Sequence, residues 1–297
     1  MTAHVVPMFD LGWNVPVFAV YPVIPVPMVQ IAVGMAPFQM EDAGLMMRQA
    51  MAEMPVHFKH CAGEALPRWR ILCYGDSLTA GFFAGGMKFE PYGRTMSEVL
   101  SAGGYPCEVS VCGHSGCTTR DMLDARQTEL ADVVGCKGNG LSRILDAKPY
   151  DLVIIMSGTN DMGRGTCSST IVEDLSHLHA VCHDRGVPTM VLAPPPAPAY
   201  GQMQEVQRQY LCQQLRHFAS CSTSVCAFLD PAVFFLPPGG IFRPSPANSA
   251  AEDLVSTANG QLWEGDGLHL APNGSQALGL GLAPLVAAQL GEEPGDY

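Results

Sequence analysis

The chain has 297 residues, 47% of them hydrophobic, and a formal net charge of −12 with only 16 Lys and Arg. This length suits one large domain, or one domain with an appendage. Nucleic acids and anionic membranes bind surfaces that are rich in positive charge, so the composition argues against both as partners.

Eleven cysteines are scattered between Cys61 and Cys226 without regular spacing. Cys73 and Cys112 fall within predicted core strands. This pattern is typical of reduced, buried thiols, and a disulfide-stapled secreted fold is not expected at this size. The sequence shows no clear targeting signal, so we expect a cytoplasmic protein, unless its N-terminal segment is a non-standard targeting segment.

Residues 1–66 differ from the rest of the chain. Residues 11–40 carry no charge and are long enough to suggest a membrane span. They contain five prolines, each of which removes a backbone donor and breaks a helix. A secretory signal would begin with basic residues, which are absent before Arg48. We therefore predict an irregular leader, rich in Pro, Met and Val and of unknown function, and no membrane span.

From Trp69 onward, short apolar runs alternate with helical patterns. The predicted strands are 70–74, 108–112, 151–156, 187–193 and 224–229, and the predicted helices are 92–102, 118–130, 169–185, 202–219 and 273–290. The run at 151–156 is almost entirely apolar and β-branched, which is typical of a strand covered on both faces. The alternation predicts an α/β fold with three layers, α/β/α, around a mostly five-stranded parallel sheet. We assign this domain to residues 67–292, followed by a tail at 293–297.

Three short motifs carry the candidate chemistry. Ser77 follows the first strand in Gly75-Asp76-Ser77, and Asn160 follows the third strand in Gly158-Thr159-Asn160-Asp161. In parallel sheets, active sites lie beyond the carboxyl ends of the strands, where both residues fall. The third motif, Asp266-Gly267-Leu268-His269, comes late in the chain, just before a predicted helix start.

These residue types suit acyl transfer from an ester. A serine hydroxyl needs a neighbouring base, and a carboxylate three residues before a histidine can orient that base. We therefore predict Ser77 as nucleophile, His269 as base and Asp266 as its orienting residue. The Asn160 amide would donate to an oxyanion, and Gly116 could offer a backbone N–H without a side chain in the way.

Each motif alone has a plainer interpretation. Ser77 could be only a helix N-cap, and Gly116 only a tight-turn glycine. His179 and His183 have the i, i+4 spacing of a helical metal site, near His177 and Cys182, but no carboxylate accompanies them. We expect a solvated helix face there, and neither metal nor cofactor in the protein.

Taken together, the motifs resemble those of the SGNH hydrolases, the GDSL-type esterases and lipases. The match covers residues 69–292: Gly75-Asp76-Ser77 in the first block, Gly116 in the second, Gly158 to Asp161 in the third and Asp266 to His269 in the last. The resemblance implies a flavodoxin-like fold, a triad of Ser77, Asp266 and His269, and an oxyanion hole formed by the Ser77 N–H, the Gly116 N–H and the Asn160 side chain.

The stretches ILCYGDSLTAG, DLVIIMSGTND and VLAPPPAP are similar to the branch of small arylesterases and acyltransferases. Two positions depart from the family pattern, with Val111 where Asn is common and His114 where an apolar residue is usual. The leader before Trp69 has no counterpart in that pattern.

The sequence thus predicts a serine esterase that acts on small-molecule carboxylic esters, with short acyl or aryl groups, through an acyl-serine intermediate. Three other functions stay open: an acyltransferase using the same serine with an alcohol acceptor, a non-catalytic binding protein on the same fold, and metal-dependent hydrolysis at the His177–His183 cluster. The irregular segment 231–262 fits either a cover over the substrate or a surface insertion. The oligomeric state is not readable.

Overall fold

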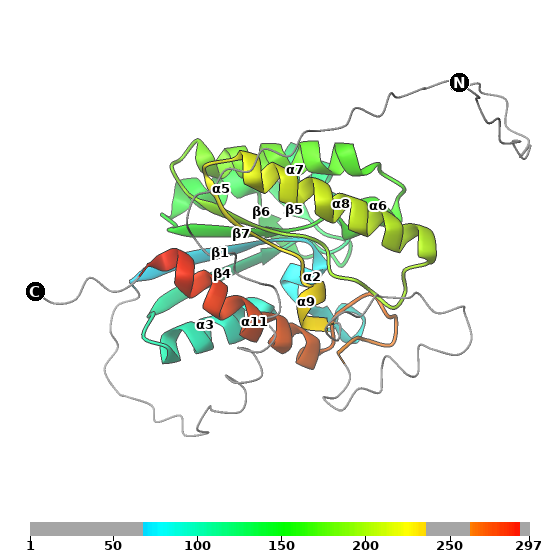
Figure 1. Cartoon of the computed structure of the whole chain (residues 1–297), viewed down its shortest axis with the longest axis horizontal. Coiled ribbons are helices and arrows are strands. Elements are labelled where there is room, and N and C mark those ends of the chain that lie inside the picture. The colour runs from blue at the N-terminus through cyan, green and yellow to red at the C-terminus, as the bar shows by residue number, and fades with distance from the viewer. Residues whose placement is uncertain (1–67, 236–261, 292–297) are drawn as a thin grey trace, which may run out of the picture. The chain divides into compact units, whose positions relative to one another are not determined.

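A computed structural model describes residues 68–235 and 262–291. Five parallel strands form its central sheet (Figure 1), in the spatial order β4-β1-β7-β8-β9. Their bounds are β1 Trp69–Gly75, β4 Cys107–Gly113, β7 Leu152–Met156, β8 Thr189–Leu192 and β9 Val225–Leu229. All five strands were predicted, each within two residues of these bounds, and the parallel sheet is confirmed.

The sheet is buried because helices cover both of its faces. All five residues of β7 are buried, as its apolar, β-branched sequence predicts. Helices α3 and α11 lie together on one face, and α5, α7 and α8 lie on the other (Figure 1). The structure is therefore the three-layer α/β/α arrangement that the sequence predicts. The longer helices are α3 Tyr92–Ala102, α7 Ser168–His183, α8 Gln202–Cys221 and α11 Pro272–Leu290.

The order of the strands creates a natural site. Numbered along the chain, the sheet reads 2-1-3-4-5, the flavodoxin-like order, so the chain runs outward from β1 in both directions. β1 pairs with β4 on one side and with β7 on the other. Ligand sites in such sheets lie beyond the strand ends at this reversal point. Ser77 follows β1 and Asn160 follows β7, so both predicted residues lie at that point.

The region 118–139 differs from the prediction of one long helix at 118–130. The helix α4 spans only Thr119–Asp124 and begins with a capping box between Thr118 and Asp121. A small antiparallel hairpin follows, with β5 Glu129–Ala131 paired to β6 Lys137–Asn139. The turn forms because Asp132 Oδ1 accepts hydrogen bonds from the backbone N–H groups of Val134 and Cys136, at 3.0 and 2.8 Å. Helix α5 Leu141–Ala147 comes next and was also not predicted.

The start of the domain contains a second hairpin that the sequence did not reveal. After β1 the chain forms a single helical turn, α2 Ser77–Ala80. The short strand β2 Phe82–Phe83 then pairs antiparallel with β3 Lys88–Phe89. A one-turn 3₁₀ helix, η1 Ala84–Gly86, connects these two strands. Helix α6 Thr159–Gly163 follows β7, and α9 Ala232–Phe235 ends the first described range.

The predicted leader at 1–66 and most of the irregular segment 231–262 lie outside the described residues. Within the described ranges, none of the helices combines the length and apolarity needed to cross a bilayer.

Gly279 allows α11 to approach α3 closely. A Cβ at this position would lie 2.4 Å from the backbone oxygen of Tyr92 and 2.9 Å from Thr95 Cβ. Gly279→Ala should therefore force the helices apart and lower the free energy of unfolding by about 1–3 kcal/mol. Urea unfolding measures this change. Gly163→Ala is the matched control, because a Cβ at that helical glycine meets no atom within 4 Å. Equal stability of the two variants would contradict the tight contact.

Candidate active site

Ser77 lies at the end of β1, where the chain turns sharply into α2. Gly75 makes the turn possible, since a Cβ there would lie 2.0 Å from the backbone oxygen of Met156. Asp76 caps α2, and its Oδ1 accepts a hydrogen bond from the Leu78 N–H at 3.0 Å. Because Ser77 is the first residue of α2, its own N–H has no acceptor within that helix.

Three predicted residues form a continuous chain of hydrogen bonds. The Ser77 Oγ lies 3.1 Å from His269 Nε2. On the other side of the ring, His269 Nδ1 lies 2.6 Å from Asp266 Oδ2. An imidazole that donates from Nδ1 to a carboxylate keeps Nε2 free to accept the serine proton. The geometry therefore suits a base acting on Ser77.

The loop that carries His269 is fixed by its own backbone. Gly267 has a φ of +65°, and its carbonyl accepts a hydrogen bond from the Ala199 N–H at 2.9 Å. The other Asp266 oxygen, Oδ1, accepts from the N–H groups of Leu268 and His269. Partial burial opposes ionisation of Asp266, but the hydrogen bonds from His269 and Leu268 outweigh it and hold the pKa of this carboxyl below its usual value.

Asn160 is held beside the predicted glycine of the second block. Its Nδ2 donates to the backbone oxygen of Cys117 at 3.0 Å, which uses one of its two amide hydrogens. Gly116 precedes Cys117 and has a φ of +75°, a conformation that favours glycine. The Gly116 carbonyl accepts a hydrogen bond from Arg164 Nη2 at 2.8 Å, which ties the Gly116 loop to the residue that follows α6. Among the described residues, no direct hydrogen bond joins Asn160 or Gly116 to Ser77.

Sequence reasoning missed two side chains that support these residues. Asp161, which received no role of its own from the sequence, accepts hydrogen bonds from the Thr119 hydroxyl at 2.6 Å and the Thr119 N–H at 3.0 Å. This contact joins the segment after β7 to the start of α4. The ring of Phe82 packs against the imidazole of His269, with their centroids 4.4 Å apart. Asp161 belongs to a polar motif, which is a sequence signal for its contact with Thr119, whereas no local sequence pattern indicates the contact of Phe82 with His269.

Only His177 of the histidine cluster on α7 is exposed, so the prediction of a solvated face is wrong for the rest of the cluster. His179 and Cys182 are fully buried. His179 Nδ1 and His183 Nε2 lie 2.8 and 2.9 Å from the hydroxyl of Thr189 on β8, so this side of α7 faces the sheet. Burial, aided by the charge of His183, lowers the pKa of His179 to about 3. Within residues 68–235 and 262–291, no three His, Cys, Asp or Glu side chains are grouped as a metal site would need.

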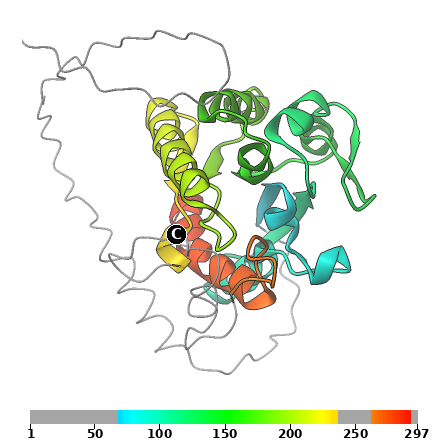
Figure 2. The ribbon, with the colours of Figure 1, turned by 90° about the vertical axis from the view of Figure 1, so that its right-hand side faces the viewer.

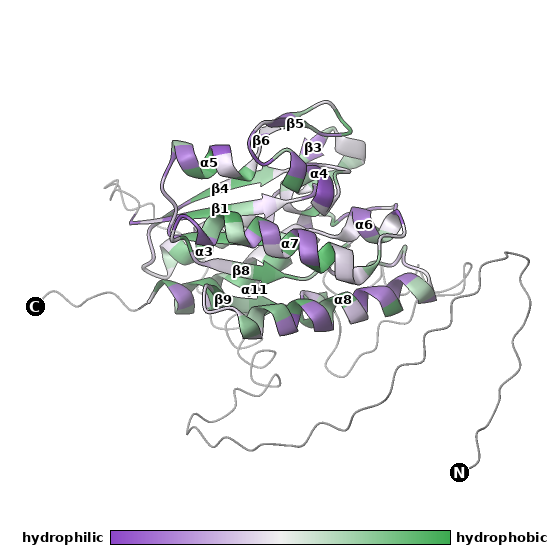
Figure 3. Cartoon of the chain, turned by 90° about the horizontal axis from the view of Figure 1, so that it is seen from above, coloured by the Kyte–Doolittle hydropathy of each residue, from purple (hydrophilic) through white to green (hydrophobic). Residues whose placement is uncertain are grey.

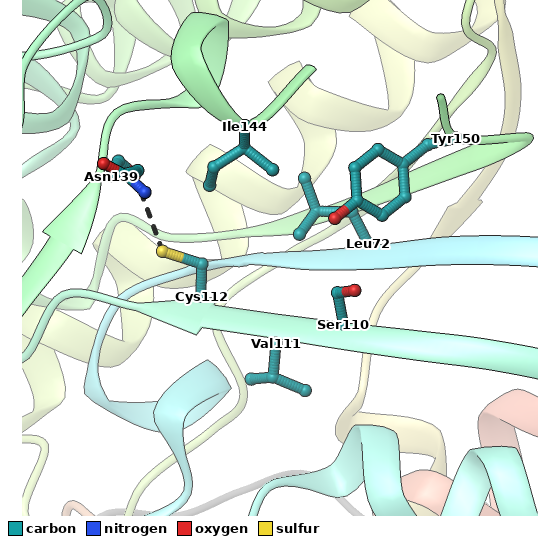
Figure 4. A pocket seen from close by; sticks show the side chains of 7 residues that line it. All are labelled: Leu72, Ser110, Val111, Cys112, Asn139, Ile144 and Tyr150. Carbon is teal, nitrogen blue, oxygen red and sulfur yellow. Dashed lines mark hydrogen bonds between the residues drawn. The ribbon is translucent and has the colours of Figure 1, made fainter. Parts of the chain in front are cut away.

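The two positions that depart from the family pattern lie on β4 and just after it. His114 is buried against the ring of Tyr74, and burial lowers its pKa. Val111 points to the opposite side of β4 from Ser110 and Cys112, as strand alternation requires (Figure 4). Ser110, Val111 and Cys112 line a cavity of about 230 Å³, together with Leu72, Asn139, Ile144 and Tyr150. None of the candidate site residues lines it, and burial raises the pKa of the Cys112 thiol to about 11. The cavity is therefore separate from the candidate active site.

Comparison with known proteins agrees with the family that the motifs resemble. The sequence pattern of the GDSL-like lipase/acylhydrolase family matches residues 73–277, which include all the candidate site residues. A search of curated proteins finds no match.

Solved structures of this fold are similar to the chain. A carbohydrate acetylesterase family member from Sinorhizobium meliloti is 24% identical with a TM-score of 0.52, covering 75% of this chain and 100% of its own. A lipase/acylhydrolase from Enterococcus faecalis is 19% identical with a TM-score of 0.51, covering 74% and 96%. A lipolytic protein of the G-D-S-L family from Veillonella parvula is 15% identical with a TM-score of 0.50, covering 73% and 97%. At these identities the likeness establishes the fold.

Burial of Asp76 should make the stability of the folded protein depend on pH. Asp76 is fully buried, and burial, together with the nearby charge of Asp161, raises its pKa from 3.8 to about 7. In the folded protein the Asp76 carboxyl keeps its proton up to about pH 7, whereas in the unfolded chain it releases the proton near pH 4. This residue therefore lowers the free energy of unfolding as the pH rises from about 4 to about 7. Asp76→Asn keeps the capping oxygen and removes the titration. Urea unfolding of both proteins at pH 5 and pH 8 should show wild type losing stability relative to the variant at pH 8. A difference that does not change with pH would contradict the raised pKa.

Proposed function

Because the chain belongs to the GDSL-like lipase/acylhydrolase family, we propose that it is a serine esterase that hydrolyses small carboxylic esters with short acyl or aryl groups. The observation that carries this proposal is the hydrogen-bond chain from Asp266 through His269 to the Ser77 hydroxyl. This arrangement has the base and orienting group that a serine nucleophile requires. The family supports a hydrolase of the esterase or acylhydrolase kind, and the serine mechanism and the acyl preference are our proposal.

The first half-reaction transfers the acyl group to the protein. The Ser77 Oγ forms a bond to the ester carbonyl carbon while its proton passes to His269 Nε2. The carbonyl oxygen becomes an oxyanion, and collapse of this intermediate breaks the bond to the leaving alcohol. His269 returns the proton to that alcohol, which departs and leaves an acyl group on Ser77.

The second half-reaction repeats these steps with water. His269 Nε2 takes a proton from water as the water oxygen attacks the acyl carbon. Collapse of the second intermediate breaks the bond to Ser77, whose oxygen recovers the proton from His269. Throughout, Asp266 holds the ring orientation and stabilises the imidazolium; its lowered pKa keeps it ionised in this role.

The oxyanion would be held by three donors, the N–H groups of Ser77 and Gly116 and the side chain of Asn160. Two features favour these donors. The Ser77 N–H opens a helix, and the Asn160 amide is oriented by the Cys117 oxygen with one hydrogen to spare. Such donors are pre-oriented before charge develops, and loss of one typically costs on the order of 10²–10³ in rate.

Hydrolysis of p-nitrophenyl esters from acetate to palmitate tests the proposal, with wild type beside Ser77→Ala. We expect activity on short acyl chains, and its loss by at least about 10³-fold in the variant, since the residual rate comes only from the remaining groups. Circular dichroism controls for folding. Wild-type activity that persists in Ser77→Ala, or a folded wild type inactive on every ester, would contradict the proposal. Activity on long chains alone would keep the mechanism and change the substrate.

A further inference from the structure

Two small hairpins expose apolar side chains, and one of these hairpins contacts the imidazole of His269. We define the apolar rim as Phe82, Met87, Phe89, Val133 and Val134. Met87 and Val133 are 82% and 70% exposed, far more than side chains that serve only the core. The first three residues belong to the segment of β2 and β3, and the two valines belong to the turn between β5 and β6. Exposed apolar side chains that are grouped together mark a binding surface.

One end of the rim lies against the candidate base. The Phe82 ring packs on the His269 imidazole, with a centroid distance of 4.4 Å and an angle of 34° between the rings. Phe82 also pairs in register with Phe89 across the hairpin, and their rings meet edge to face at 6.1 Å. The apolar surface is therefore continuous from the base outward.

The other end of the rim lies against Gly116. A Cβ on Gly116 would lie 2.4 Å from Val133 Cγ1, so this valine occupies the space beside the glycine. The Val133 N–H donates to the backbone oxygen of Ser115 at 3.1 Å, which ties the turn to the Gly116 loop.

The two hairpins also meet each other. A Cβ on Gly86 would lie 2.6 Å from Phe82 Cε2 and 3.1 Å from Val134 Cγ1. Figure 2 shows the two hairpins on the same side of α2, and Figure 3 shows β3 beside β5 and β6. The rim thus runs without a break from the base to the candidate oxyanion glycine.

We infer that the apolar rim binds the leaving alcohol of the ester, and that the preferred substrates carry an apolar alcohol group. This inference rests on the proposed function. In that reaction His269 Nε2 must reach the oxygen of the leaving alcohol, so this part of the substrate lies at the imidazole. Phe82 packs on the same imidazole, and the rim continues from it. An alkyl or aryl group on the alcohol oxygen would therefore lie against the rim.

Two isomeric esters separate the alcohol side from the acyl side. Hexyl acetate places the long chain on the alcohol and ethyl hexanoate places it on the acyl group, while ethyl acetate is the short reference. The test variant is the double substitution Met87→Ser and Val134→Ser, which changes exposed side chains and leaves Val133 beside Gly116. The matched control is Met203→Ser with Val206→Ser, since these residues are exposed on α8 and lie outside the rim.

We expect wild type to prefer hexyl acetate over ethyl acetate in kcat/KM. In the rim variant this preference should fall by about fourfold for each methylene group that loses its contact. The preference for ethyl hexanoate over ethyl acetate should change much less, and the control variant should keep both preferences. These results together would support the rim as the alcohol site.

Three results would overturn the inference. The first is loss of the preference for ethyl hexanoate with that for hexyl acetate kept, which would assign the rim to the acyl group. The second is an equal fall on all three esters. The third is a wild type that sediments as a dimer while the rim variant sediments as a monomer, which would make the rim a contact between two copies of this chain. Failure of the proposed function looks different, since wild type would then hydrolyse none of the esters, p-nitrophenyl acetate included.

Discussion

The hydrogen bond between His269 Nε2 and Ser77 Oγ joins positions 192 residues apart, and the site depends on it. It forms only if the end of β1 and the loop before α11 are placed with sub-ångström accuracy. β1 is held on both sides by β4 and β7, so the position of Ser77 is fixed by the centre of the sheet. The His269 loop is held by α11, which packs on α3, and by the contact of Gly267 with Ala199. A nucleophile and a base supplied by rigid elements need little rearrangement before reaction.

The carboxyl groups around this contact have different environments, which separates their roles. Asp266 is half exposed and accepts hydrogen bonds from the His269 ring and from two backbone N–H groups, and these hold its pKa low. Asp76 and Asp161 are buried, and burial raises the pKa of both. The lowered pKa therefore favours an ionised carboxylate beside the His269 ring. Its two buried carboxyls support the structure, Asp76 by capping α2 and Asp161 by binding Thr119.

Much of this arrangement was predictable from the sequence. Long apolar strands such as 151–156 and the alternation with helices determine the sheet, because a strand buried on both faces needs helices on both sides. The motifs place Ser77 and Asn160 beyond the carboxyl ends of two strands, and the structure shows that these strands are neighbours. What could not be predicted depends on packing between distant segments. The ring of Phe82 meets His269 across a long stretch of the chain, and the buried histidines of α7 resemble a polar face in sequence.

The two short hairpins could not be predicted from the sequence either. β5 and β6 have three residues each, too few for an alternating pattern, and their turn depends on a single side chain, Asp132. Helical spacing after Thr118 therefore suggested one long helix. The apolar rim arises from these two unpredicted hairpins, so the surface that we propose for the leaving alcohol could not be predicted from the sequence. The buried framework, in contrast, follows from simple apolar periodicity.

The central claim is that Ser77 is the nucleophile and that His269 activates it. Its most direct test is covalent labelling by a p-nitrophenyl alkylphosphonate, which transfers its phosphonyl group to an activated serine and releases p-nitrophenolate. Mass spectrometry of the digested protein should show one phosphonyl group on the peptide that contains Ser77. The same treatment should leave Ser77→Ala unlabelled and His269→Ala labelled far more slowly. A label on another residue, or labelling of Ser77 that proceeds equally fast without His269, would contradict the account.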